Sequence, residues 1–176
     1  MEQYRSFDQL RNNQLAITRT GFFRPYFELS GGQFTYGKLS YASLWKTKMI
    51  LESAQNTWII KRKGAFSRSL LVTDSNEMEL GIVTPELLSR KVNLMMNNGF
   101  EAVYLAKKLF TRTFSLTSEQ YGDILDIKTE LWGMKKPFTI TVDLDKLKQI
   151  PDMPLLALLG VNLILMKQAQ AAAAGG

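Results

Sequence analysis

The chain has 176 residues and a formal net charge of +6, with 22 Lys or Arg against 16 Asp or Glu, and it contains neither cysteine nor histidine. Without these two residue types there are no disulfides, no thiolate or imidazole ligands for zinc, and no nucleophile–base pairs that use Cys or His. We therefore expect a non-enzymatic protein with no catalytic residues, no metal and no cofactor.

Short runs of alternating apolar and polar residues, each followed by a turn signal, fill the chain between residues 15 and 144. This alternation is typical of strands that bury one face, and its repetition indicates a β-sandwich or a β-barrel. We predict about twelve strands, at residues 15–18, 22–29, 33–41, 47–53, 57–63, 67–73, 78–84, 91–96, 101–107, 112–118, 124–131 and 138–144. Between two of them, Asn98 and Gly99 predict a type I′ hairpin turn, because Asn and Gly accept the positive φ values of that turn.

An apolar segment without a polar face follows the strands, from Met153 to Met166. We predict a helix over residues 152–168, and a helix that is apolar all round must be buried in protein or in lipid. Crossing a bilayer takes about 20 apolar residues, whereas shorter runs are more often core helices. A core helix is therefore predicted rather than a transmembrane span, with a membrane tail as the alternative. Residues 169–176 are mostly Ala and Gly, and we expect them to form a frayed tail.

The strands and the helix together indicate the fold class. A sheet that closes on itself has no exposed edges, and a barrel of more than about eight strands is too wide to be filled by its own side chains. The apolar helix is the natural filler. We therefore predict a mainly β protein, a closed barrel of about twelve strands wrapped around a C-terminal hydrophobic α-helix. The barrel is a single domain over residues 1–168, and the tail over residues 169–176 lies outside it.

Two groups of segments carry a resemblance to a known family. The ending IPDMPLLALLGV (residues 150–161) is similar to the closing helix of the tubby C-terminal-like fold, a group that includes tubby domains, phospholipid scramblases and LURP-one-related proteins. The series WIIKR (58–62), LVTDSN (71–76) and LGI (80–82) resembles the strand, Asp-centred turn and Gly-containing strand of the same group. The resemblance covers residues 15 to 166. The sequence shows no scramblase-type proline-rich leader, cysteine cluster or calcium-binding acidic loop, so scrambling and calcium dependence are not carried over.

The strongest polar cluster lies on the strands predicted in the middle of the chain. Tubby domains bind phosphoinositides through basic residues on neighbouring strands, so the resemblance implies an anion or lipid head-group site on such residues here. The candidate site residues are Lys46, Lys48, Lys61, Arg62, Lys63 and Arg68. The alternative interpretation is that these charges are solvated and only prevent edge-to-edge pairing of strands.

The excess positive charge lies between Lys38 and Arg112, where there are twelve Lys or Arg and six Asp or Glu. Such an excess favours acidic partners, so we expect an anionic membrane surface or an acidic protein. Nucleic acid is less favoured, because aromatic residues interleaved with the basic ones are few, with Trp45 and Phe110 as the candidates. The N-terminus lacks the form of a signal peptide, and a cytoplasmic protein with peripheral membrane contact is expected. The leading function is a binding or scaffold domain for anionic phospholipid head groups, and scramblase-like lipid transport is the alternative.

Overall fold

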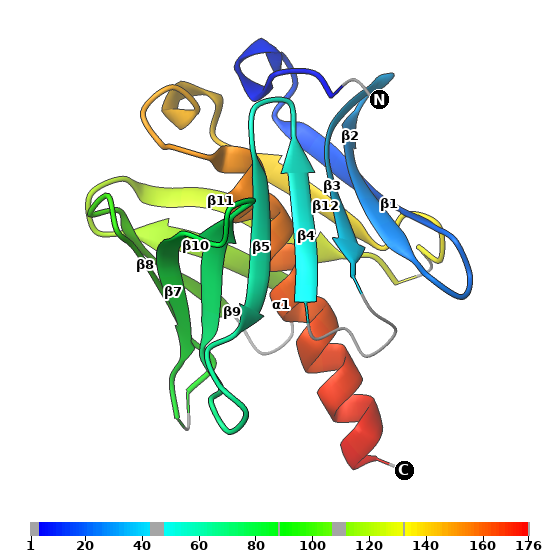
Figure 1. The fold of residues 1–176 in the computed structure, drawn as a ribbon. Helices are drawn as coiled ribbons and strands as arrows, with labels where there is room; N and C mark the ends of the chain where they lie inside the picture. The colour runs from blue at the N-terminus through cyan, green and yellow to red at the C-terminus, as the bar shows by residue number, and fades with distance from the viewer. Residues whose placement is uncertain (1–3, 43–47, 88, 107–111, 132, 176) are drawn as a thin grey trace.

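The computed structural model describes residues 4–42, 48–87, 89–106, 112–131 and 133–175. In these parts of the chain, twelve antiparallel strands form a closed barrel around one long helix, which confirms the predicted fold class (Figure 1). The strands are β1 (Gln14–Thr20), β2 (Tyr26–Gly31), β3 (Phe34–Tyr41), β4 (Lys48–Ser53), β5 (Thr57–Arg62), β6 (Leu70–Asp74), β7 (Glu79–Pro85), β8 (Val92–Met96), β9 (Glu101–Ala106), β10 (Thr113–Ser118), β11 (Gly122–Thr129) and β12 (Phe138–Val142). The helical elements are η1 (Phe7–Gln9), η2 (Leu144–Lys146) and α1 (Met153–Ala174).

Each strand pairs with the next one along the chain, and β1 pairs with β12 to close the barrel. Every predicted strand overlaps an observed one. Paired residues on neighbouring strands face the same side of the sheet, so inward-facing apolar side chains form rows across it. One such row consists of Leu39, Leu51 and Trp58 on β3, β4 and β5. All three are buried. Closure in this register removes the sheet edges, and it leaves the alternate side chains on the outer wall, where they include polar pairs such as Lys38 and Glu52 and apolar pairs such as Ile50 and Ile59.

Helix α1 runs through the middle of the barrel and fills it. Its residues from Met153 to Leu163 are all buried, as predicted for a core helix. Taken by length and hydropathy alone, α1 also meets the criterion for a helix that can cross a membrane, and half of its most apolar window is buried by the barrel. The helix does not end at residue 168 as predicted. It continues through exposed residues to Ala174, because alanine has the highest helix propensity of all residues.

The hairpin between β8 and β9 differs from the predicted type I′ turn. Of its loop residues only Gly99 has a positive φ, of 86°, and Asn98 does not. The backbone N–H of Met96 donates to Phe100 O at 2.9 Å, and the N–H of Gly99 donates to Met96 O at 3.0 Å. The loop therefore contains three residues, in the form of a tight turn followed by a left-handed glycine.

The direction of the strands divides the loops between two ends of the barrel. Because neighbouring strands are antiparallel, all loops that follow odd-numbered strands lie at one end, where α1 also leaves the barrel (Figure 1). We call this the exit end and the opposite one the entry end. The described residues of the exit end are 21–25, 42, 63–69, 86–87, 89–91, 112, 130–131, 133–137 and 167–175. Those of the entry end are 4–13, 32–33, 54–56, 75–78, 97–100, 119–121 and 143–152.

Candidate functional site

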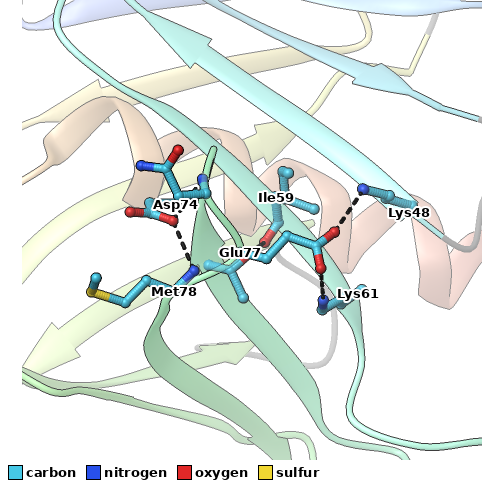
Figure 2. Close-up of polar contacts among 8 residues, drawn as sticks. Lys48, Ile59, Lys61, Asp74, Glu77 and Met78 are labelled. Atoms are coloured by element: carbon cyan, nitrogen blue, oxygen red, sulfur yellow. Dashed lines mark hydrogen bonds and ion pairs between the residues drawn. The ribbon is translucent and has the colours of Figure 1, made fainter.

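Two of the predicted site residues face each other on the outer wall of the barrel. Lys48 on β4 and Lys61 on β5 are register partners, and both donate to the carboxylate of Glu77, each at 3.2 Å (Figure 2). Directly opposed like charges destabilise a strand pair, so the carboxylate between them compensates their repulsion. We call these three residues the outer-wall cluster. Its two lysines already have an anionic partner within the chain.

The turn between β6 and β7 holds Glu77 in place. One carboxylate oxygen of Asp74 accepts hydrogen bonds from the backbone N–H groups of Asn76 and Met78, both at 2.8 Å (Figure 2). Glu77 has a left-handed backbone with φ of 64°, which is uncommon for a residue with a side chain. The hydrogen bonds from Lys61 and Lys48 lower the pKa of the Glu77 carboxyl, which favours its ionised form.

The other predicted residues lie elsewhere. Arg62 follows Lys61 directly, so it faces the opposite side of β5, at the mouth of the barrel on the exit end. Arg68 lies in the loop after β5, beside the same mouth. Lys63 is exposed in that loop, and Lys46 lies outside the described residues. The structure therefore separates the predicted cluster into the outer-wall lysines and a pair of arginines at the exit end.

A pocket of about 440 Å³ lies between the β5–β6 loop and the last turns of α1. Its cationic lining comes from Arg62, Arg68 and Lys167, and its apolar lining includes Phe66, Leu163 and Met166. As far as the structure describes its walls, they include no carboxylate. We call this the exit pocket. A site that combines three cations with apolar surface is suited to an anion attached to a hydrophobic group.

Lys167 is the residue of α1 that brings positive charge to the exit pocket. Its Nζ lies 4.5 Å from the centre of the Phe114 ring and donates to the backbone carbonyl of Arg90 at 3.5 Å. Burial of the ammonium group lowers its pKa below the ordinary lysine value, and the positive charge of Arg90 lowers the pKa further. An anion in the pocket would reverse this effect, because an opposite charge favours the protonated form.

A second pocket, of about 500 Å³, lies over β8, β9 and β10. Its charged residues are Glu101 and Glu119, and its described lining contains no Lys or Arg. This composition does not suit an anion. Among the described residues, no group of three or more acidic side chains is arranged to hold a metal ion.

The sequence analysis missed Lys167, Arg90 and Phe66 as parts of a site. The signal that could have found them is the order of the strands. In a barrel of consecutive antiparallel strands, the β5–β6 and β7–β8 loops must lie at the same end, and a helix that starts after β12 and passes through the barrel must leave there. The aromatic candidates for nucleic-acid binding, Trp45 and Phe110, lie outside the described residues.

Comparisons with known proteins give no family assignment, since no family model matches the chain and no significant match is found among curated proteins or solved structures.

Proposed function

We propose that the protein is a non-enzymatic binding module for anionic phospholipid head groups, and that the exit pocket is the head-group site. The observation that carries the proposal is the lining of this pocket, where Arg62, Arg68 and Lys167 meet without a carboxylate among the described lining residues. The proposed module is cytoplasmic and binds membranes peripherally. A barrel of twelve strands around a C-terminal helix is also what the tubby-like resemblance implies, and we propose membership of that group on this basis.

The chemistry of the pocket favours a phosphate ligand. The planar guanidinium groups of Arg62 and Arg68 can each donate two hydrogen bonds to phosphate oxygens. Lys167 is held in a partly buried position beside another cation, so a phosphate dianion would relieve an existing repulsion. Phe66 and Met166 supply apolar contacts for the glycerol and the first acyl carbons of a lipid.

The outer-wall cluster is less suited to the same ligand. A phosphate that approached Lys48 and Lys61 would have to displace Glu77, which bonds to both of them. No such internal competitor lines the exit pocket in the part of the chain that the structure describes. We therefore propose head-group recognition by Arg62 and Arg68 and not by the strand lysines.

The test uses a soluble head group, inositol trisphosphate, and isothermal titration calorimetry. The double variant Arg62→Gln/Arg68→Gln is compared with Lys48→Gln/Lys61→Gln, which removes the same charge from the outer wall. We expect wild-type protein to bind, the exit-pocket variant to bind at least about tenfold more weakly, and the outer-wall variant to stay within about twofold. Thermal melts check that both variants fold.

Two results would overturn the proposal. If the wild-type protein does not bind inositol trisphosphate, the head-group function is wrong. If both double variants lose affinity equally, the attraction is a general effect of net charge and the exit pocket is not the site.

A further inference from the structure

The exit end carries most of the large apolar side chains that are exposed to solvent. Among the described residues there are nine such side chains, and six of them belong to the exit end: Phe22, Phe23, Phe66, Leu87, Leu131 and Met134. Phe22 and Phe23 are 84% and 86% exposed at the tip of the β1–β2 hairpin, where their rings make an edge-to-face contact. Phe66 is fully exposed in the β5–β6 loop. Large aromatic side chains at the tips of separate loops serve no purpose in the barrel core.

Positive charge gathers at the same end. The described part of the exit end contains nine cationic side chains and two carboxylates. The carboxylates are Glu86 and Glu130, and the cations are Arg24, Lys63, Arg68, Arg90, Lys91, Arg112, Lys135, Lys136 and Lys167. Both carboxylates have partners within the chain, since Glu86 accepts from Ser89 and Asn93 and Glu130 accepts from Thr139.

The entry end has the opposite character. Its described residues include four cations, Arg5, Arg11, Lys146 and Lys148, against six carboxylates, Asp8, Glu77, Glu119, Asp143, Asp145 and Asp152. Phe34, the first residue of β3 beside this end, is 38% exposed, and the guanidinium of Arg5 covers its ring at 3.8 Å from the ring centre. Among the described residues, the excess cations and the exposed phenylalanines of the loop tips lie at the exit end, so the barrel is polarised along its axis.

We propose that the exit end docks on an anionic lipid bilayer, with the barrel axis steep to the membrane and the loop tips inserted among the head groups. Interfacial binding by peripheral proteins combines basic residues, attracted by anionic lipids, with aromatic and aliphatic side chains that enter the boundary region. The exit end has both kinds of side chain. Its loops lie around the point where α1 leaves the barrel (Figure 1). The entry end, with its excess of carboxylates, faces the aqueous phase.

A bilayer fits this surface better than a folded protein partner. The exposed side chains stand on four different loops, between residues 22 and 134 of the chain, and each loop contributes both an apolar tip and a cation. Apolar side chains on separate loops can insert into a bilayer independently of one another, whereas a protein interface has a contiguous apolar patch at its centre. The inference rests on the proposed function only in the choice of an anionic lipid. A head group held in the exit pocket would present its acyl chains on the same side.

Vesicle sedimentation tests the docking surface. Vesicles of phosphatidylcholine with phosphatidylserine are compared with vesicles of phosphatidylcholine alone, for the wild type, for Phe22→Ser/Phe23→Ser, which lies outside the exit pocket, and for Met78→Ser as a control. Met78 is an exposed apolar side chain of the entry end. We expect binding to the anionic vesicles only, a loss of about tenfold or more in the double phenylalanine variant, and a change of less than about twofold in the control.

The orientation has a direct readout, because the chain contains no cysteine. An environment-sensitive fluorophore is attached to Gly64→Cys at the exit end or to Ser75→Cys at the entry end. A Cβ at residue 64 meets no atom within 4 Å, so the substitution is compatible with the loop. We expect a blue shift on binding anionic vesicles for the label at 64 and none for the label at 75.

The outcomes separate the two proposals. Any of three results would overturn the docking surface: no binding to vesicles, equal blue shifts at both labels, or unchanged binding by the double phenylalanine variant. If inositol trisphosphate binds while any of these occurs, head-group recognition stands and membrane docking by the exit end is wrong. If vesicles bind with the expected phenylalanine dependence while inositol trisphosphate does not bind, the docking surface stands and the head-group site is wrong.

Discussion

The phenolic oxygen of Tyr104, on β9, donates a hydrogen bond of 2.7 Å to the backbone carbonyl of Leu156 on α1. Tyr104 is fully buried, and its ring stacks on Phe114 with 5.6 Å between the ring centres. This bond links the barrel wall to the central helix in a place where water does not reach. A buried hydrogen bond of this kind fixes the rotation and depth of the helix, because sliding α1 would leave the hydroxyl unpaired.

Tyr104→Phe removes this bond and keeps the ring. We expect the free energy of unfolding to fall by about 1 kcal/mol, the usual net value of one intramolecular hydrogen bond. Urea denaturation at neutral pH measures the change. Tyr36→Phe is the matched control, because Tyr36 is also buried but no hydrogen bond of its hydroxyl is found among the described residues, so a change of less than about 0.5 kcal/mol is expected there. Equal losses in the two variants would contradict the role given to the Tyr104 bond.

The buried phenols also predict a loss of stability in alkali. Burial raises the pKa of Tyr41 to about 12 and raises the pKa of Tyr104 well above its ordinary value. Unfolded tyrosine ionises near pH 10, so above that pH the unfolded chain has lost protons that the folded protein retains, and the free energy of unfolding falls. The stability that the protein gains by keeping these phenols protonated is fully present below about pH 10, and it is lost progressively as the pH rises to about 12. Urea midpoints over this range should fall less steeply in Tyr104→Phe than in wild type, and parallel curves would show that other groups cause the loss.

Gly160 permits the close contact between α1 and the barrel wall. A Cβ built on Gly160 would collide with Cδ1 of Ile127 and would lie 3.0 Å from Cε1 of Tyr104. Alanine gains up to about 1 kcal/mol in helix propensity, whereas overpacking a filled core costs about 1–3 kcal/mol. We expect Gly160→Ala to lower the free energy of unfolding by about 1 kcal/mol or more. Gly64→Ala, at a position with open space around it, should be neutral within about 0.5 kcal/mol.

Much of the fold could be predicted because its patterns are local. Phe138, Ile140 and Val142 alternate along one strand, and this period of two is visible in the sequence without any knowledge of partners. The apolar run of α1 is equally visible. The hairpin after Met96 was predicted at the right place with the wrong turn type, because the choice between a two-residue and a three-residue loop depends on the strand register.

The candidate site could be predicted only in part, because it depends on how distant segments meet. Lys61 and Arg62 are neighbours in sequence but face opposite sides of β5, which separates the predicted cluster. Lys61 forms its ion pair with Glu77, whose backbone is left-handed. No local pattern in the sequence requires this backbone conformation, so the pair could not be predicted. Lys167 joins Arg62 in the exit pocket across more than a hundred residues of chain, so only the strand order places them together.

The positive charge of Lys167 is expected to act in opposite directions on the stability of the protein and on its affinity for the ligand. Its lowered pKa shows that the folded protein disfavours the charged form, and the side chain is partly solvated, which weakens the effect. Lys167→Met keeps the stem of the side chain and removes the charge. We expect the free energy of unfolding to stay equal or rise by up to about 0.5 kcal/mol, while binding of inositol trisphosphate weakens severalfold. A less stable variant with unchanged binding would mean that Lys167 is a structural residue and does not contact the ligand.

Leu158→Asp tests the burial of α1 most directly. Leu158 is fully buried in the first half of the helix, and an aspartate there would place an unpaired charge among apolar side chains. We expect the variant not to fold, and Leu158→Ala, which only leaves a cavity, to lose about 2–5 kcal/mol in urea denaturation. Ala169→Asp introduces the same charge into the exposed part of the same helix, where it should cost less than about 1 kcal/mol through its interaction with the helix dipole. A soluble Leu158→Asp protein with an unchanged melting temperature would mean that α1 does not fill the barrel.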